Sequence, residues 1–161
     1  HIDGVKTIQV TSAQEMYEKV MEHYIASSII VKAAAVSDYR PLSVSTEKMK
    51  KKEDIIELKL TRNPDILMEL GKKVTNQVLV GFSMETQNLE EFAKEKLQKK
   101  NLDMIVANDI SKPGAGFKVD TNVVKIIYKD GKVEDMALMS KDDLAHIILD
   151  KAFNIYLNKR K

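Results

Sequence analysis

The sequence predicts an α/β domain in which a mostly parallel central sheet is flanked by helices. Three observations indicate this class: short apolar or alternating runs that suit strands, amphipathic stretches with capping residues between them, and a repeated strand-then-helix order. The 161 residues are enough for one domain with a buried core. We therefore expect a single domain over residues 1–161 that ends in a β-hairpin and a helix.

The first third of the chain carries three strand patterns and one helix. Val5–Val10 ("VKTIQV") alternates apolar and polar side chains and predicts a strand. Ser12 and Glu15 form a capping-box pattern ahead of the helical stretch "AQEMYEKVMEHYIAS". Ser28–Val36 is a nearly continuous apolar run, typical of a strand covered on both faces. After a loop and the lysine run "EKMKKK", Ile55–Thr61 again alternates as a strand does.

The middle of the chain predicts a helix, a strand and a second helix. Pro64 suits the first turn of a helix, with Asn63 as its cap, and this helix ends near Gly71. Val78–Phe82 is a short apolar strand, and Asn88 can cap the helix "LEEFAKEKLQKK".

The last third predicts a strand, a hairpin and a long helix. Leu102–Asp109 is another apolar strand, followed by the turn-rich loop "KPGAGF". The Asp130–Gly131 dipeptide is a strong hairpin signal within "VVKIIYKDGKVEDMAL". Ser140 and Asp143 then cap an amphipathic helix that runs to about Leu157. The whole order matches a Rossmann-like sheet with a C-terminal hairpin and helix.

Composition excludes several classes of protein. The net charge is only +2, so a cationic binding site would have to be local. No run approaches the roughly 18 apolar residues that span a bilayer, and no secretory signal opens the chain. Because the chain has no cysteine, it has no disulfide, thiol nucleophile or zinc–thiolate site, which fits a reducing cytoplasm.

The common catalytic motifs are absent from the sequence. It contains no H-E-x-x-H, no G-x-S-x-G and no P-loop, and its three histidines lie at the N-terminus and inside two predicted helices. Gly114 and Gly116 begin a G-x-G, but Val119 stands where the third glycine of a dinucleotide fingerprint belongs. A nicotinamide-dependent dehydrogenase therefore shares the predicted architecture but lacks its signature here.

Polar residues gather where the predicted strands end. In open α/β sheets, ligands bind beyond the carboxyl ends of the strands. These residues are Ser37, Asp38 and Arg40 after the second strand, Asn63 and Asp65 after the third, Ser83, Glu85 and Thr86 after the fourth, and Asn108 and Asp109 in the last. Each one alone suits an ordinary loop residue or a cap, but the set favours a binding site.

Two groups of lysines could serve that site. One is the run between Glu47 and Lys52, and the other is the pair Lys96 and Lys100, which share a face of one predicted helix. Two local cation groups suit a compact polyphosphate better than a long duplex, since nucleic-acid surfaces spread their charge. A nucleic-acid-binding module that uses the lysine loop, or a merely solvated surface, stays the alternative.

Six motifs in register resemble one known family. "AAAVSDYRP", "EKMKKK", "LTRNPDIL", "VGFSMET", "KLQKKNLDMIVANDIS" and "GFKVDTN" together resemble the phosphopantothenoylcysteine synthetase domain of bacterial coenzyme A biosynthesis. The resemblance covers nearly the whole chain. It implies a cytoplasmic ligase that joins 4'-phosphopantothenate to cysteine through an acyl-cytidylate, with CTP as co-substrate and Mg²⁺. It also implies a homodimer, often fused to a flavin-dependent decarboxylase, with no nucleic-acid or membrane partner.

The resemblance also assigns residues. Lys48, the first lysine of the K-x-K-K pattern, corresponds to the essential lysine of the family, and it would also contact the nucleotide. The other implied nucleotide contacts are Lys32, Ala33, Ala34, Asp38, Asn63, Pro64, Asp65, Ile66, Phe82, Lys96 and Lys100. The family begins with a strand, a glycine-rich turn and an asparagine-containing segment that have no counterpart here. We therefore expect the C-terminal portion of the family domain, and a fragment that binds CTP without turnover is the alternative.

Overall fold

A five-stranded mixed sheet forms the centre of the protein, whose computed structural model describes residues 2–44, 47, 55–85, 87–112 and 119–160. The strand order is β1-β4-β5-β7-β8, with β1 at Ile29–Lys32, β4 at Val78–Glu85, β5 at Met104–Asp109, β7 at Val124–Tyr128 and β8 at Val133–Asp135. The first three strands are parallel, β7 runs antiparallel to β5, and β8 runs antiparallel to β7. Four of the five strands thus share one direction, which confirms the predicted α/β class.

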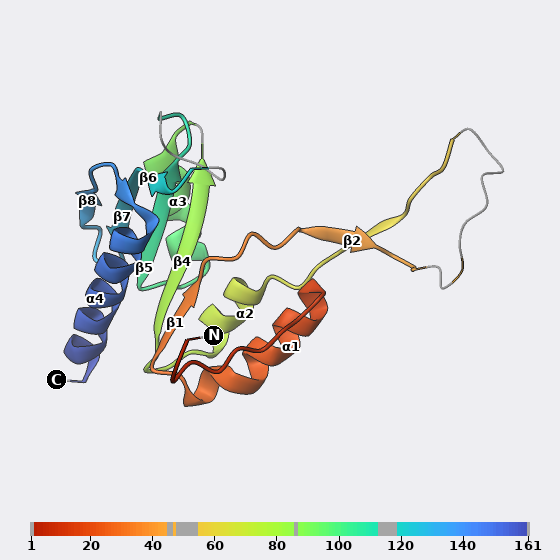
Figure 1. The fold of residues 1–161 in the computed structure, drawn as a ribbon, viewed down its shortest axis with the longest axis horizontal. Coiled ribbons are helices and arrows are strands. Elements are labelled where there is room, and N and C mark those ends of the chain that lie inside the picture. Colours follow the sequence, from red (N-terminus) through yellow and green to blue (C-terminus); the bar gives the residue numbers. More distant parts are fainter. Residues whose placement is uncertain (1, 45–46, 48–54, 86, 113–118, 161) are drawn as a thin grey trace.

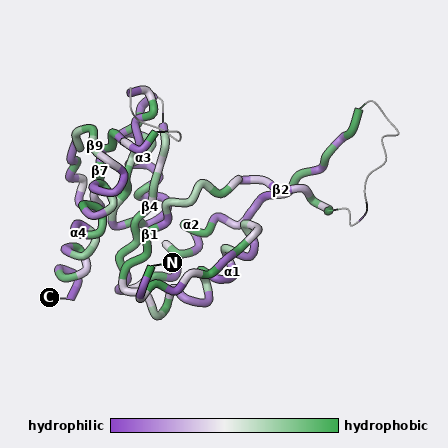
Figure 2. The backbone as a smooth tube through the Cα atoms, in the orientation of Figure 1, coloured by the Kyte–Doolittle hydropathy of each residue, from purple (hydrophilic) through white to green (hydrophobic). Residues whose placement is uncertain are grey.

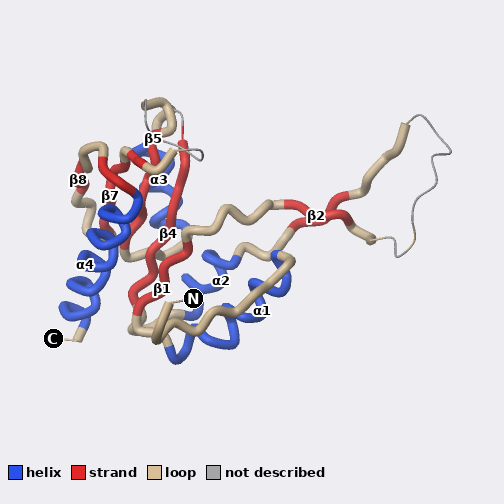
Figure 3. The backbone as a smooth tube through the Cα atoms, in the orientation of Figure 1, coloured by secondary structure: helices blue, strands red, loops and turns tan. Residues whose placement is uncertain are grey.

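Helices cover both faces of this sheet (Figures 1 and 3). On one face lie α1 (Ala13–His23), α2 (Ile66–Lys73) and α3 (Leu89–Lys99), and a short 3-10 turn, Tyr24–Ala26, follows α1. The other face is covered by α4 (Lys141–Lys159). None of the described helices is both long and apolar enough to cross a bilayer.

Alternation along the strands divides the core between these two layers. Leu79 and Ile105 point to the face of α2 and α3 and are fully buried there. Val80 and Val106, the next residues along the same strands, are equally buried against α4. Because both faces of β4 and β5 are covered, these strands read as continuous apolar runs in the sequence.

The capping signals at Ser12 and Ser140 and the hairpin signal are confirmed, whereas Asn88 stands at the N-cap of α3 with a φ of +48° and no side-chain hydrogen bond to the helix. The Ser12 hydroxyl accepts from the Glu15 N–H at 3.1 Å, and the Glu15 carboxylate reaches back to accept from the Thr11 N–H at 2.7 Å. At the start of α4, Ser140 accepts from the Asp143 N–H at 3.0 Å. The hairpin turn also forms as predicted, with Gly131 at a φ of +90°, a conformation that glycine adopts without strain.

Three predicted strands differ from the structure, and two of them lie before residue 40. Residues 5–10 form no strand and are mostly exposed, because no described segment pairs with them, and a strand pattern cannot form a ladder without a partner. The predicted strand Ser28–Val36 is reduced to β1, which lies at the sheet edge with Val31 38% exposed, so it is not covered on both faces. Residues 33–36 instead leave the sheet.

A two-stranded arm projects from the body of the protein. The predicted loop around Arg40 forms β2 (Tyr39–Pro41), which pairs antiparallel with β3 (Leu60–Arg62). The predicted strand at residues 55–61 is therefore mostly wrong: only its end is a strand, and it belongs to the arm. Figure 1 shows the arm extending away from the sheet, and Figure 2 shows hydrophobic stretches on it. A second small pair joins β6 (Thr121–Asn122) to β9 (Met139–Ser140).

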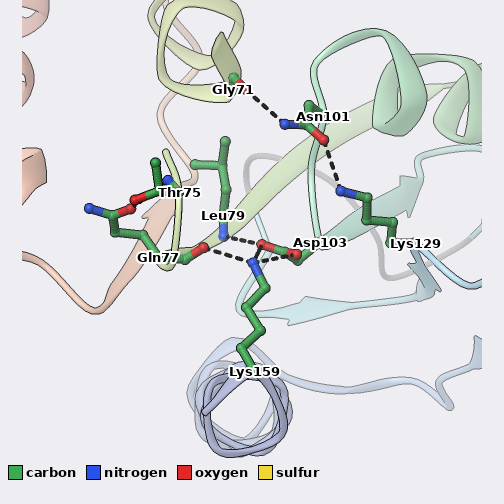
Figure 4. Close-up of polar contacts among 8 residues, drawn as sticks. All are labelled: Gly71, Thr75, Gln77, Leu79, Asn101, Asp103, Lys129 and Lys159. Carbon is green, nitrogen blue, oxygen red and sulfur yellow. Dashed lines mark hydrogen bonds and ion pairs between the residues drawn. The ribbon is translucent and has the colours of Figure 1, made fainter. Parts of the chain in front are cut away.

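Gly71 allows α2 to approach the end of α3. A Cβ at this position would lie 1.9 Å from the Lys100 carbonyl oxygen, and the Gly71 carbonyl accepts from the Asn101 side chain at 2.9 Å (Figure 4). Gly71→Ala is therefore expected to lower the free energy of unfolding by about 1–3 kcal/mol, because backbone must move to make room. Urea denaturation measures this loss.

Gly81→Ala is the matched comparison for that prediction. Its new Cβ would meet only side-chain ends, those of Leu102 at 2.7 Å and Leu67 at 2.8 Å, which can rotate away. We expect the smaller loss at Gly81. A Gly71→Ala variant as stable as the parent would contradict the close helix contact.

Candidate functional site

A pocket of about 750 Å³ opens beyond the carboxyl ends of β1 and β4. Its walls come from the segment after β1, the start of α2, the end of β4, one face of α3 and one face of α4. The strands are parallel, so the segments that follow them meet at the same edge of the sheet. The pocket therefore lies where the strand-end pattern predicted a binding site.

The structure brings nearly all the residues implied by the resemblance to this pocket. Of the twelve, eleven line it: Lys32, Ala33, Ala34, Asp38, Asn63, Pro64, Asp65, Ile66, Phe82, Lys96 and Lys100. Lys48 lies outside the described residues, as does most of the lysine run. Shared location does not test what each side chain binds, so the individual roles stay predictions.

The strand-end polar residues divide into two groups. Ser37, Ser83 and Asn108 also line the pocket. Arg40, Glu85 and Asp109 do not line it, and Thr86 lies outside the described residues. The edge of the sheet thus gathers most but not all of these side chains.

Asn63 does not cap α2, contrary to the prediction. The N-cap is Asp65, whose carboxylate accepts from the Met68 N–H at 3.0 Å, and the helix starts at Ile66 rather than at Pro64. Asn63 instead donates to the Ser37 carbonyl at 2.8 Å and accepts from Arg40 at 2.9 Å. An asparagine before a proline matches a cap pattern locally. Here, however, the side-chain amide of Asn63 forms its hydrogen bonds with the distant segment at residues 37–40.

Asn63→Ala is expected to detach the segment after β1 from the start of α2. Loss of the hydrogen bonds to Ser37 and Arg40 should cost about 1–2 kcal/mol of stability and weaken ligand binding. Chemical denaturation measures the first effect and titration with nucleotide the second. Asp65→Asn keeps a side chain that can cap α2 and serves as a comparison, since it leaves the amide of Asn63 in place. An Asn63→Ala variant with parental stability would contradict the bridging role.

Lys100 and Asp65 form an ion pair within the pocket. Their charged atoms are 2.7 Å apart, and the Lys100 side chain is only 17% exposed. Burial by itself would raise the pKa of Asp65, but the hydrogen bonds from Lys100 and from the Met68 N–H hold that pKa below its ordinary value. Asp65 is therefore ionised at neutral pH and links α2 to the end of α3.

Lys96 and Lys32 are half-buried cations of the same pocket. Within the described ranges neither makes an ion pair, although Lys32 donates to the Ala34 carbonyl at 2.9 Å. Burial lowers the pKa of the Lys96 ammonium, and the positive charge of Lys100 lowers it further. The same two causes, in the same order, lower the pKa of Lys32. Positive charge thus exceeds the negative charge that directly opposes it, which favours an anionic ligand.

Several pocket residues were missed by the sequence analysis. They lie on the α4 side and are Asn122, Lys141, Leu144, Ala145, Ile148 and Leu149. The helical period places the α4 members on one face, but only packing of α4 on the sheet decides that this face meets the pocket. Ser83 was noted as a strand-end residue, and its buried hydroxyl has no hydrogen-bond partner among the described residues.

The described residues offer no preformed metal cage. Within them, no three histidine, cysteine, aspartate or glutamate side chains gather closely enough to hold an ion. The pocket carboxylates Asp38 and Asp65 lie beside lysines, and Asp65 is already paired with one. These residues do not fit a resident metal ion.

The structure is an α/β domain with a lysine-lined pocket at the carboxyl ends of its parallel strands. The profile of the family described as "DNA/pantothenate metabolism flavoprotein C-terminal domain" matches residues 1–156. The chain therefore belongs to this family.

Three comparisons place the chain among its relatives. It is 49% identical to the coenzyme A biosynthesis bifunctional protein CoaBC of Bacillus subtilis, over 89% of this chain and 36% of that protein. It matches the crystal structure of the C-terminal domain of a CoaBC protein with a TM-score of 0.75 and 39% identity, over 94% of this chain and 65% of that one. A Cab2 mutant in complex with phosphopantothenate-cysteine shares the fold, with a TM-score of 0.69 at 16% identity, over 94% of this chain and 53% of that one.

Proposed function

We propose that this chain is the nucleotide-binding part of a phosphopantothenate–cysteine ligase that acts in the cytoplasm in coenzyme A biosynthesis. Family membership and the similarity to CoaBC proteins support the activity. The observation that carries the proposal is the gathering of Lys32, Lys96 and Lys100 at one pocket with a single direct carboxylate partner. A bound nucleoside triphosphate would supply negative charge that balances the positive charge of these lysines.

The proposed chemistry explains why such a site needs cations. The carboxylate oxygen of 4'-phosphopantothenate attacks the α-phosphorus of CTP, and the bond to pyrophosphate breaks. The cysteine amine then attacks the acyl carbon of this acyl-cytidylate, loses a proton and displaces CMP. Negative charge moves onto phosphate oxygens in the first step, and fixed ammonium groups stabilise it without reorganisation.

In this proposal, different residues of the pocket contact different parts of the nucleotide. Lys96 and Lys100 contact phosphates, as mobile point charges suited to them. Ala33 and Ala34 offer backbone groups, Asp38 offers a polar contact, and the helix start from Asn63 to Ile66 forms one wall with Phe82 packed nearby. A volume of about 750 Å³ lies in the ordinary range for small-molecule sites.

Magnesium enters this proposal with the nucleotide. Mg²⁺ binds hard oxygen ligands and commonly takes them from substrate phosphates and water rather than from an all-protein cage.

The chain spans only 36% of the length of the Bacillus subtilis relative, so the complete protein contains more than the part described above in this proposal. We propose that the complete protein also carries a flavin-dependent decarboxylase domain and acts as a homodimer. The arm supports a dimer because large apolar side chains on it are exposed. They are Tyr39, Leu42, Val44, Ile55, Ile56, Leu58 and Leu60, each more than half exposed.

Isothermal titration with Mg-CTP, with Mg-ATP in parallel, tests the proposed function. We expect saturable binding that prefers CTP, since the family resemblance implies the cytidine nucleotide. Absence of binding for either nucleotide would overturn the proposal for this chain. Tighter binding of ATP would keep a nucleotide-dependent ligase but reject the cytidylate intermediate.

A further inference from the structure

Lys32 approaches the pocket from a different element than Lys96 and Lys100. It is the last residue of β1 and pairs in register with Gly81 of β4, whereas Lys96 lies on α3 and Lys100 is the residue directly after it. All three side chains line the same pocket. An anion bound in this pocket can therefore contact ammonium groups that come from two different parts of the fold.

The ammonium of Lys32 is held by a weak local contact rather than by an ion pair. Within the part of the chain that the structure describes, its hydrogen bond is to the Ala34 carbonyl, at 2.9 Å, two residues away. By contrast, Lys100 has a carboxylate partner in Asp65. Lys32 can exchange a neutral carbonyl for a charged phosphate oxygen, and charge-assisted hydrogen bonds are roughly twice as strong as neutral ones.

The charges around Lys32 also favour an anion at this point. The groups that act on it are Lys100, Asp65, Lys96 and Asp38, and burial together with Lys100 lowers its pKa. Like charges gathered in a half-buried site repel one another more strongly than they do in water. An anionic ligand removes this cost, and the gain increases with the ligand's negative charge.

We propose that the Lys32 side chain is a third phosphate-binding group, which adds a cation from β1 to those of Lys96 and Lys100 and makes affinity depend steeply on the number of phosphates. The inference rests on the proposed function, because it concerns how that nucleotide site recognises a triphosphate. It assigns a specific role to the charge of Lys32, where the family resemblance implies only a nucleotide contact.

A structural role for Lys32 makes a different prediction. If the side chain served only to hold the segment after β1 through the Ala34 carbonyl, a neutral donor would suffice. Three substitutions separate the two roles: Lys32→Met removes charge and donor, Lys32→Gln keeps a donor without charge, and Lys32→Arg keeps both. Lys99→Met is the matched control, since Lys99 is an exposed lysine of α3 that does not line the pocket.

Titration of each variant of this chain with CTP, CDP, CMP and inorganic tripolyphosphate tests the inference. We expect Lys32→Met and Lys32→Gln to weaken the binding of CTP and of tripolyphosphate about tenfold, a loss of about 1.4 kcal/mol of binding free energy. The same variants should weaken CMP binding less than twofold. Lys32→Arg and Lys99→Met should keep the parental preference for the triphosphate. Circular dichroism shows whether each variant is folded.

Three outcomes would overturn the inference. Lys32→Gln with a parental ratio of CTP to CMP affinity would show that only the hydrogen bond to Ala34 matters. Equal losses for CTP and CMP in a folded Lys32→Met variant would show a general loss of the site rather than phosphate recognition. A parent chain that binds neither nucleotide nor tripolyphosphate would overturn the proposed function itself, and this inference with it.

Discussion

Lys48→Gln is expected to lower amide formation by the full-length enzyme on the order of 10³-fold, or about 4 kcal/mol of transition-state stabilisation. Lys48 lies outside the described residues, so this expectation rests on its place in the K-x-K-K pattern that resembles the family motif. Glutamine keeps a similar length and a hydrogen-bond donor but removes the charge that would stabilise the reacting phosphates.

Single-turnover measurements of pyrophosphate release and of amide product would locate the affected step. A defect in the first step predicts that both are lost together, while CTP binding changes far less. Lys52→Gln is the matched control, since it makes the same charge change within the same run of lysines, and we expect turnover within about twofold of the parent. Unchanged turnover in Lys48→Gln would remove Lys48 from the mechanism.

Asp103→Ala is expected to destabilise the protein by about 3 kcal/mol, because it leaves buried polar groups without a partner. Asp103 is only 7% exposed, and its carboxylate accepts from the Leu79 N–H at 2.8 Å. Lys159 lies 2.7 Å from the same carboxylate and also donates to the Gln77 carbonyl at 2.9 Å. Figure 4 shows this group joining the end of α4 to β4 and to the residue before β5.

Asp103 and Lys159 lie away from the pocket, so a change there should alter the stability of the protein without altering its CTP affinity. Asp103 precedes β5 and contacts the start of β4, so it lies at the edge of the sheet opposite the pocket. We therefore expect Asp103→Ala to shift the urea midpoint strongly while the folded protein keeps parental CTP affinity. Lys159→Met and the double variant complete a double-mutant cycle. The double variant should lose less unfolding free energy than the sum of the losses in the two single variants. A loss below about 1 kcal/mol for Asp103→Ala would contradict the proposed burial cost.

Local sequence patterns predicted the elements whose hydrogen bonds are themselves local. Ser12 and Ser140 cap their helices as expected, because a cap joins residues three positions apart. The hairpin around Gly131 forms for the same reason. Continuous apolar runs also identified β4 and β5, although β4 extends to Glu85, three residues beyond the predicted end.

The patterns failed where the partner is remote in sequence. Residues 5–10 alternate as a strand does, but pairing decides whether a strand exists, and no described segment pairs with them. Asn63 matches a cap, yet its amide bridges to Ser37 and Arg40, more than twenty residues away. The loop at residues 39–41 became a strand because residues 60–62 lie beside it.

The candidate site shows the same division. Strand-end polarity indicated its place, and Lys96 and Lys100 were identified by their spacing on one helix face. Their relation to Lys32 and Asp65 could not be predicted, since those residues lie on β1 and at the start of α2. The contribution of α4 to the pocket likewise depends on how the helix packs on the sheet.

The sequence by itself determined the α/β class, the caps at Ser12 and Ser140, the hairpin, and the end of the strands at which polar residues gather. Each of these follows from side-chain period or from hydrogen bonds between near neighbours. Only the tertiary structure decided that β1 is an edge strand, that an arm leaves the body, and that Lys32 meets Lys96, Lys100 and Asp65 at one pocket. These features depend on which distant segments pack together, because strand pairing and charge neighbourhoods are set by contacts in space rather than by spacing along the chain.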